Sequence, residues 1–378
     1  MTPELAEHET AIVNEIERFA DNVLRPQAAA IDEEARFAIE HLPALGDMGI
    51  MGMNLPEAYG GVELSGPALY RAVELIAGAC GSTASMLTAH FLATDSLLLG
   101  DDGDLRERFL PAAADGRALG AFALTEPEAG SNPADMRSFA VPEEGGYRLK
   151  GSKCFISNAG AADFIVVYAK TDKAAGARGV SAFVVEPKTM DGIEIGPHEK
   201  TMGLRGGHVF SLTLDCHVPA ENRLGAEGTG FRTAMKVLDN GRIEVAAQAT
   251  GIAAAALTDA IAYAKERKVG GHPIADFQGL QWMLADMATD LAAARALGYE
   301  AARKRGGAGR YSTESAFAKL YASEAAWRIA DKALQIHGGY GYTRDMPLER
   351  YLRDLRIFRI YEGSSEIQRT IIARGLLA

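Results

Sequence analysis

Hydrophobic positions divide the chain into three stretches with different periods. From residue 4 to about 118, apolar residues such as Ile12 and Ile16 recur at helical spacing. From about 119 to 222 the chain has short runs rich in Val, Ile, Phe and Thr, separated by Gly, Asp and Pro, which is typical of strands. From about Phe231 onward, long helical patterns return. The pattern therefore predicts an α+β protein with a β domain between two helical domains.

The same pattern gives the expected elements. Helices are expected from residue 5 to Pro26 and over 35–48, 67–79, 82–99 and 104–115. Strands are expected over 147–157, 164–171, 179–186, 192–199 and 208–218, with a tight hairpin at Gly145-Gly146. Helices are again expected over 231–268, 276–305, 312–337, 344–360 and 364–376.

These elements predict three domains. The N-terminal α-helical domain covers 1–118, a small, mostly antiparallel β domain (a barrel or a sandwich) covers 119–224, and a C-terminal four-helix-bundle domain covers 225–378. The helix at 82–99 is apolar on most sides and is expected to be buried.

Composition and charge narrow the function classes. The 378 residues carry a net charge of -11, which argues against binding nucleic acid or an anionic membrane through bulk charge. Cys80, Cys154 and Cys216 show no metal-site spacing, and we expect a reduced, cytoplasmic protein without a metal. The acidic N-terminus resembles neither a signal nor a transit peptide, and we expect no apolar run that approaches a membrane span.

The most informative short stretch lies near the end of the chain. Glu362 is followed at once by Gly363, then by Ser364 and Ser365, and then by a helical pattern. Glycine permits a sharp turn and close approach of a ligand, and serine caps helix N-termini. A carboxylate at such a junction suits proton abstraction, although a solvated acid that caps a helix is the more ordinary reading of this stretch alone.

Two further motifs suit a flat polar ligand. Pro127 and Gly130 shape a loop that leaves the hydroxyls of Thr125 and Ser131 at its ends. Downstream, an aromatic and a hydroxyl residue stand two positions apart in Lys153-Cys154-Phe155-Ile156-Ser157-Asn158, and residues i and i+2 share a strand face. No Gly-x-Gly-x-x-Gly follows a strand, and neither a phosphate loop nor a Gly-x-Ser-x-Gly elbow is found. Taken alone, each motif favours an ordinary hairpin loop and a core phenylalanine over a ligand site.

Together these motifs resemble the acyl-CoA dehydrogenase family. The resemblance rests on Thr125-Glu126-Pro127 with Gly130-Ser131, on Phe155-Ile156-Ser157-Asn158, on Gln335-Ile336-His337-Gly338-Gly339-Tyr340-Gly341, and on Tyr361-Glu362-Gly363-Ser364-Ser365. The motifs occur in the family's order and span the chain. The last of them is similar to the short- and medium-chain type.

The resemblance implies a catalytic role for Glu362. As the base, it would remove the α-proton of an acyl thioester while the β-hydrogen leaves as hydride to the flavin, which gives the trans-2-enoyl thioester. Burial against the ligand would raise its pKa toward neutrality. Another branch of the family carries the base at the position that matches Gly241, where glycine cannot serve. Glu244 is near this position but off register, and we interpret it as structural.

The resemblance also implies FAD as cofactor. Residues that match family contacts to FAD are Phe122, Leu124, Thr125, Gly130, Ser131, Phe155, Ser157, Ser364 and Glu366, and, from a neighbouring subunit, Arg267, Phe277, Gln278, Gln335 and Gly339. The chain departs from the family at Gly270-Gly271, where Phe-Gly is usual, and this change is expected to weaken FAD binding. Phe155 also replaces a usual Trp.

For the thioester, Ser131, Asp239 and Arg242 match family contacts to CoA. Tyr361, Gly363, Met86 and His90 are expected to border the acyl group. The expected partners are an acyl-CoA substrate, an electron-transfer flavoprotein, and further copies of the chain in a homotetramer (a dimer of dimers) that shares FAD between subunits. The alternatives are a relative that acts on a carrier-protein-bound or unusual acyl group or uses oxygen as acceptor, and a flavin-free binding or scaffold protein on the same fold.

Overall fold

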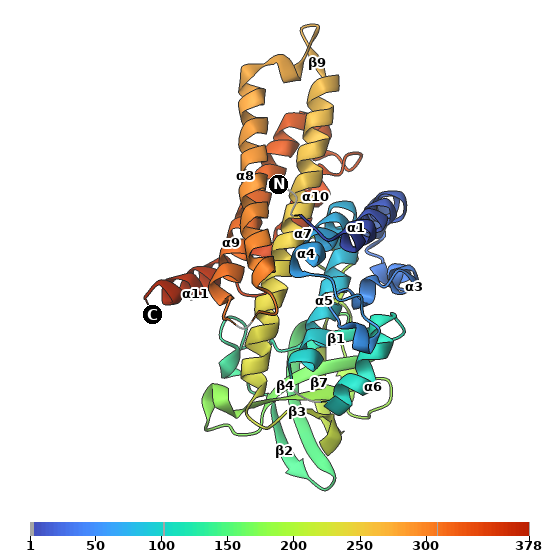
Figure 1. The fold of residues 1–378 in the computed structure, drawn as a ribbon, viewed down its shortest axis with the longest axis vertical. Coiled ribbons are helices and arrows are strands. Elements are labelled where there is room, and N and C mark those ends of the chain that lie inside the picture. The colour runs from blue at the N-terminus through green and yellow to red at the C-terminus, as the bar shows by residue number, and fades with distance from the viewer. Residues whose placement is uncertain (1–3, 101–102, 308, 378) are drawn as a thin grey trace.

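The computed structural model describes residues 4–100, 103–307 and 309–377, and it confirms the predicted α+β fold. In the sequence, the strands lie between two sets of helices. In space, the sheet forms one end of an elongated molecule (Figure 1). The predicted domain limits at 118/119 and 224/225 fall in the loops that join helices to strands.

The N-terminal part is helical, as predicted. Its helices are α1 (Glu7–Phe19), α2 (Arg25–Glu34), α3 (Leu42–Asp47), α4 (Gly66–Ala79), α5 (Gly81–Leu99) and α6 (Gly103–Ala114). Most residues of α5 are buried, as its uniformly apolar composition predicts.

Two helix predictions in this part are wrong. The first helix does not end at Pro26, because α1 continues through a π-helical turn (Ala20–Leu24) into α2. Pro26 lies in the first turn of α2, next to the π-turn, where the altered hydrogen-bond ladder accommodates its missing N–H. The helix expected over 35–48 is reduced to α3, since Ala35 ends α2 in a left-handed conformation (φ 49°) and a 3-10 turn follows at Ala38–His41.

The β domain is one mostly antiparallel sheet of eight strands. They are β1 (Gly120–Ala123), β2 (Phe139–Glu143), β3 (Gly146–Ser157), β4 (Phe164–Lys170), β5 (Val180–Val185), β6 (Ile193–Ile195), β7 (Val209–Pro219) and β8 (Arg223–Leu224). The order is β6-β7-β3-β2-β4-β5-β8, and β1 pairs with β4 in parallel. Gly145, at φ 75°, forms the predicted hairpin between β2 and β3. The prediction missed β1, β2 and β8, which are too short to show a period.

The C-terminal part is built from long helices. They are α7 (Gly230–Glu266), α8 (Gln278–Lys304), α9 (Ser312–His337), α10 (Leu348–Leu355) and α11 (Ser365–Leu377), and β9 (Lys268–Val269) and β10 (His272–Pro273) form a hairpin between α7 and α8. The helix predicted over 344–360 is shorter, because α10 ends at Leu355 and a 3-10 turn follows at Ile357–Arg359.

Helix α7 is the axis of the molecule. It runs from the sheet to the β9–β10 hairpin at the opposite end (Figure 1), and α4, α5, α8, α9 and α10 pack against it. Contrary to the expectation from sequence, α7 is long and apolar enough to cross a membrane, but 72% of its most apolar window is buried inside the protein. Burial in a core explains the same composition, and α7 therefore gives only weak evidence for a membrane span.

Candidate active site

Glu362 lies in the turn that joins α10 to α11. Both Glu362 (φ 52°) and Gly363 (φ 88°) adopt left-handed backbone conformations, which glycine tolerates and glutamate rarely adopts. The carbonyl of Ser364 accepts the first helical hydrogen bond of α11 from the N–H of Gln368 at 2.9 Å. Strain at a non-glycine residue is a mark of functional sites when the surrounding structure holds it in place.

Two buried side chains hold this turn. Lys319, on α9, donates a hydrogen bond from Nζ to the carbonyl of Gly363 at 2.7 Å. Gln368, on α11, donates from Nε2 to the carbonyls of Gly363 at 2.8 Å and Glu362 at 3.2 Å. Both Lys319 and Gln368 are fully buried. The backbone around Glu362 is therefore fixed by donors from two different helices.

The carboxylate of Glu362 extends over Gly241 of α7. A Cβ added at Gly241 would overlap Glu362 Oε2 and would also crowd Leu92 of α5. Oε2 is buried and has no hydrogen-bond partner among the described residues. Gly241 thus leaves the space that the carboxylate occupies, and the carboxylate keeps one oxygen free.

Charges near Glu362 shape its acidity. Burial raises the pKa of Glu362 to about 7, while the cations Arg242 and Lys319 oppose the rise. Arg242 is itself buried and forms an ion pair with Asp239 at 2.5 Å, and Asp239 also accepts a hydrogen bond from Ser312. A carboxylic acid with a pKa near 7 suits proton transfer at neutral pH.

The residues expected to border the acyl group come from α5 and from the turn that carries Glu362. His90 and Met86 are fully buried on α5. His90 accepts a hydrogen bond at Nδ1 from the N–H of Gly120 at 3.0 Å, and burial lowers its pKa to about 4, so the imidazole is neutral. Tyr361 packs edge-on against Phe358 with 5.4 Å between ring centroids, and its hydroxyl has no partner among the described residues.

The motif residues from the β domain form an open shelf. Phe155 is 67% exposed and has a φ of 58° at a β-bulge between Lys153 and Ile156. The bulge breaks the strict alternation expected for Phe155 and Ser157. Thr125 and Ser157 are half-buried, Gly130 and Ser131 are exposed, and Leu124 is buried. An exposed aromatic ring and hydroxyls for which the described residues show no hydrogen bond fit a flat ligand with polar edges.

A buried ion pair anchors this shelf. Lys153 Nζ donates to the Glu126 carboxylate at 2.8 Å and to the carbonyl of Leu124 at 3.0 Å. Glu126 also accepts hydrogen bonds from the backbone N–H groups of Arg137 and Ser138. Behind the shelf, Phe122 packs against Tyr168 with 5.2 Å between ring centroids. The ion pair therefore ties β3 to the loop that carries Thr125.

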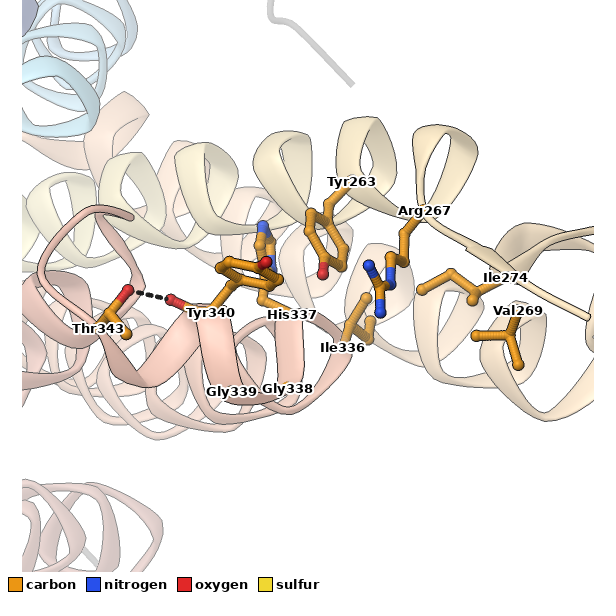
Figure 2. Close-up of a pocket in the computed structure, with 10 residues that line it drawn as sticks. All are labelled: Tyr263, Arg267, Val269, Ile274, Ile336, His337, Gly338, Gly339, Tyr340 and Thr343. Atoms are coloured by element: carbon orange, nitrogen blue, oxygen red, sulfur yellow. Dashed lines mark hydrogen bonds between the residues drawn. The ribbon is translucent and has the colours of Figure 1, made fainter.

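A second group of expected cofactor residues lies at the far end of the molecule. Arg267 and Gly339 line a cavity of about 450 Å³, in which Tyr263 stacks on His337 with 4.3 Å between ring centroids (Figure 2). Arg267 follows Arg242 by 25 residues on α7, roughly 38 Å along the helix axis at 1.5 Å per residue. Phe277 and Gln278 begin α8 beside the same hairpin.

Apart from the residues of the shelf, the structure separates most of the expected site residues into two groups. Glu362, Gly363, Gly241, Arg242 and Asp239 are brought together around the turn. The other group, Arg267, Phe277, Gln278 and Gly339, lies at the hairpin end together with the exposed Gln335, the third residue from the end of α9. Ser364 and the exposed Glu366 lie at the start of α11, and a hydrogen bond with Ser364 lowers the pKa of Glu366.

Sequence reasoning missed several residues of the site. The sequence did not predict that Lys319 and Gln368 hold the turn at Glu362. It also did not predict that Lys153 and Glu126 form a buried ion pair. The one sequence signal for Lys319 is its place among small residues at helical spacing, with Ala316 and Ala322 three positions away on either side. A cation at a buried helical position needs a specific acceptor.

Three acyl-CoA dehydrogenase family models match the chain in order. The N-terminal domain model matches residues 6–117, the middle domain model matches 121–216, and the C-terminal domain model matches 228–377. The chain is 42% identical to the short-chain specific acyl-CoA dehydrogenase of Clostridium acetobutylicum, over 95% of each chain. It is 43% identical to the acryloyl-CoA reductase (NADH) of Anaerotignum propionicum, over 95% of this chain and 92% of that protein.

Two solved structures are also similar to this chain along its whole length. Butyryl-CoA dehydrogenase from Megasphaera elsdenii matches with a TM-score of 0.96 and 38% identity over the whole of both chains. A chain from a structure described as the electron transferring flavoprotein of Acidaminococcus fermentans matches with a TM-score of 0.97 and 41% identity, also over the whole of both chains.

Proposed function

The chain belongs to the acyl-CoA dehydrogenase family, and we propose that it oxidises an acyl-CoA thioester to the trans-2-enoyl-CoA with Glu362 as the catalytic base. The observation that carries this proposal is the carboxylate of Glu362, held over Gly241 with a free Oε2 and a pKa of about 7. The three domain models and the relatives that cover nearly the whole chain support it.

Glu362 Oε2 would take the proton from the α carbon of the thioester. The α carbon becomes an enolate as the proton leaves, and negative charge develops on the thioester oxygen. Backbone N–H donors near that oxygen would stabilise the charge, and the N–H of Glu362 is the donor that the family resemblance implies. Lys319 and Gln368 contribute by fixing the turn, so that the base keeps its position during the transfer.

FAD, when bound, supplies the acceptor for the β-hydrogen. The shelf of Phe155, Thr125 and Ser157 has the exposed ring and hydroxyls that suit a flavin ring and its ribityl chain. The cavity with Arg267 offers a guanidinium to the pyrophosphate of FAD. Arg242 and Asp239 are proposed to meet CoA beside the base, together with Ser131.

We further propose an electron-transfer flavoprotein as the electron acceptor. The match to a chain from a structure described as an electron transferring flavoprotein supports this choice. A homotetramer, arranged as a dimer of dimers, and a cytoplasmic location complete the proposal. Oxygen uptake during turnover in air would favour instead the alternative with oxygen as acceptor.

The test is an anaerobic titration of the purified yellow protein with saturated acyl-CoA esters. At least one ester should bleach the flavin absorbance of the wild type. Glu362→Gln should keep the yellow colour and slow bleaching by at least about 100-fold, because the base is lost. A yellow protein that no acyl-CoA bleaches would contradict the proposed substrate class, and bleaching at the wild-type rate by Glu362→Gln would contradict the role of Glu362.

A further inference from the structure

The proposed mechanism does not use Glu244 and Gln248, two of the buried polar side chains of α7. Glu244 and Gln248 follow Gly241 by three and seven residues, which places all three on one face of the helix. Glu244 is 3% exposed and Gln248 is 1% exposed. Each has one oxygen, Glu244 Oε2 and Gln248 Oε1, with no hydrogen-bond partner among the described residues. Native proteins rarely leave such atoms unpaired, so each needs an explanation.

The other oxygen of Glu244 takes part in a charged cluster. Arg305 donates to Glu244 Oε1 at 2.6 Å and to the carboxylate of Asp95 at 3.0 Å. One guanidinium thus faces two buried carboxyl groups. Burial raises the pKa of Glu244 to about 8 against the effect of Arg305, and the charge of Asp95 adds to the rise. Burial therefore favours the protonated form of Glu244, and because Oε1 accepts from Arg305, Oε2 would carry the proton.

The orientation of the Gln248 amide follows from Thr88. Gln248 Nε2 donates to Thr88 Oγ1 at 3.0 Å, and the Thr88 hydroxyl donates to the carbonyl of Ser85 at 3.4 Å. Because Thr88 uses its own hydrogen elsewhere, it accepts from Gln248, and the amide oxygen points away as a free acceptor. Glu244 thus offers a donor, and Gln248 offers an acceptor one turn further along α7.

These two groups lie beyond the point where the chemistry takes place. The reacting α carbon must lie at Glu362, at the level of Gly241, where Leu92 supplies an apolar wall. Glu244 is about 4.5 Å and Gln248 about 10 Å further along the helix axis, at 1.5 Å per residue. Tyr361, next to Glu362, has a hydroxyl that is also buried and without a described partner. Leu92 is thus an apolar neighbour at Gly241, whereas Glu244 and Gln248 carry unpartnered oxygens beyond it.

We propose, on the basis of the function proposed above, that Glu244 and Gln248 select an acyl chain with a hydroxyl group on a carbon beyond Cβ. A hydroxyl accepts one hydrogen bond and donates another. It therefore satisfies Glu244 Oε2 and Gln248 Oε1 at once, and an alkyl chain satisfies neither. A site built to hydrogen-bond a substrate hydroxyl discriminates strongly against the analogue that lacks it.

The experiment compares matched pairs of CoA esters on the FAD-loaded protein. The pairs are butyryl-CoA with 4-hydroxybutyryl-CoA and pentanoyl-CoA with 5-hydroxypentanoyl-CoA. The measured quantity is the ratio of kcat/KM for the hydroxylated ester to that for its alkyl partner. We expect a ratio of at least about tenfold for one pair in the wild type. Because the ratio compares two substrates on one protein, a general loss of stability does not change it.

Variants test the residues. Glu244→Leu leaves Arg305 paired one-to-one with Asp95, so the cluster stays balanced, and the ratio should fall to about one. Gln248→Leu should lower the ratio too. Asp95→Asn removes a charge that raises the pKa of Glu244, so Glu244 becomes more ionised and loses the donor at Oε2, and the preference for the hydroxylated ester should fall as well. FAD content and thermal stability, measured for each variant, show that it is folded.

The outcomes separate this inference from the proposed function. If alkyl esters bleach the flavin as well as or better than hydroxylated ones, this inference is wrong and the proposed function stands. An unchanged ratio in both Glu244→Leu and Gln248→Leu also overturns it. If no acyl-CoA bleaches the flavin, both the proposed function and this inference fail.

Discussion

At the scale of single residues, Glu362 combines backbone strain with a free carboxylate oxygen. A glutamate at φ 52° costs of order 1–3 kcal/mol relative to an unstrained conformation. Glycine would remove that strain but would also remove the carboxylate. Lys319 and Gln368 hold the strained conformation in place because they fix the carbonyl of Gly363. This conformation directs the side chain of Glu362 toward α7.

Gly241 leaves the space that the Glu362 carboxylate occupies, and Gly241→Ala should displace that carboxylate. The added Cβ would overlap Glu362 Oε2, and a displacement of about 1 Å reduces the rate by roughly 100-fold. The measurement is the rate of anaerobic flavin reduction by a saturating acyl-CoA. Alanine is the better helix former by about 1 kcal/mol, so a weaker helix would not explain the loss.

Gly103→Ala is the matched control for this substitution. Gly103 begins α6, and a Cβ there meets no atom of the described residues within 4 Å, so activity should be unchanged. Equal, wild-type rates for both alanine variants would show that the overlap at Gly241 does not constrain Glu362.

At this scale, the sequence predicts the candidate site through motifs rather than through geometry. Glu362 and Arg242 stand in short patterns that can be recognised in sequence. The left-handed conformation of Glu362 and the acceptor of Lys319 depend on residues more than 40 positions apart, and no local pattern encodes such a contact. Glu244 was interpreted as structural, and the structure adds the free oxygen that this interpretation did not foresee.

At the scale of elements, α9 contributes to the acidity of Glu362 through Lys319, whose charge opposes the rise in pKa that burial causes. Glu362 must be ionised to accept a proton, so the rate of flavin reduction should rise with pH through about 7. Burial lowers the pKa of Lys319 to about 8, so it is still charged in this range and favours the carboxylate. Lys319→Met removes that charge, the pKa of Glu362 rises, and the midpoint of the pH profile should move to higher pH.

Gln368→Leu is the control for the charge of Lys319. It removes hydrogen bonds to the same turn without changing any charge, so the midpoint should stay near that of the wild type even if the rate falls. Stopped-flow measurement of flavin reduction between pH 5.5 and 9, a range of about 1.5–2 units on either side of the expected midpoint, gives all three profiles. Identical midpoints for wild type and Lys319→Met would exclude the electrostatic role.

The Lys153–Glu126 pair should contribute strongly to stability, because it is buried. Its side chains are 0% and 3% exposed, and Lys153→Met would leave Glu126 without its cation. Breaking such a pair lowers the free energy of unfolding by about 3–5 kcal/mol, which urea denaturation measures. The double variant Lys153→Met/Glu126→Gln should recover part of the loss, since no uncompensated charge remains.

Lys150→Met on the same strand provides the comparison. Lys150 pairs with Asp215 at 3.3 Å with both side chains about half exposed, and an exposed pair contributes less than about 1 kcal/mol. If Lys150→Met and Lys153→Met lowered the free energy of unfolding by similar amounts, burial would not explain the contribution of the Lys153–Glu126 pair.

The element predictions succeeded where the chain is long and periodic. Helices α7, α8 and α9 were predicted to within a few residues, because their apolar faces repeat over many turns. Strands β1 and β8 are four and two residues long, and their place is set by pairing with β4 and β5 rather than by a local period. The predicted helix end at Pro26 is wrong because a π-turn just before it lets the helix continue. Such a turn has no simple sequence signal.

At the scale of the whole molecule, the expected FAD residues are divided between two ends. The shelf with Phe155 and Thr125 lies at the sheet end, whereas Arg267 and Gly339 line the cavity near the β9–β10 hairpin (Figures 1 and 2). One FAD molecule would have to span the length of α7 to contact both the shelf and the cavity of a single chain. If all of these residues contact FAD, each FAD would be completed by a second copy of the chain.

Complementation between two inactive variants tests this expectation. Glu362→Gln lacks the base, and Arg267→Ala lacks the cation expected at the pyrophosphate; Arg267 is exposed in the single chain, so its removal should leave the fold intact. In a mixed dimer, the subunit with Arg267→Ala keeps Glu362 and receives Arg267 from its partner, so one complete site forms. If FAD is shared, doubly tagged mixed dimers should be more active than the two parent variants combined. If each FAD is held by one chain, no site in the mixed dimer has both residues, and activity should equal the sum of the parents. The comparison thus decides between the two arrangements, and it does so without any assumption about the acyl group.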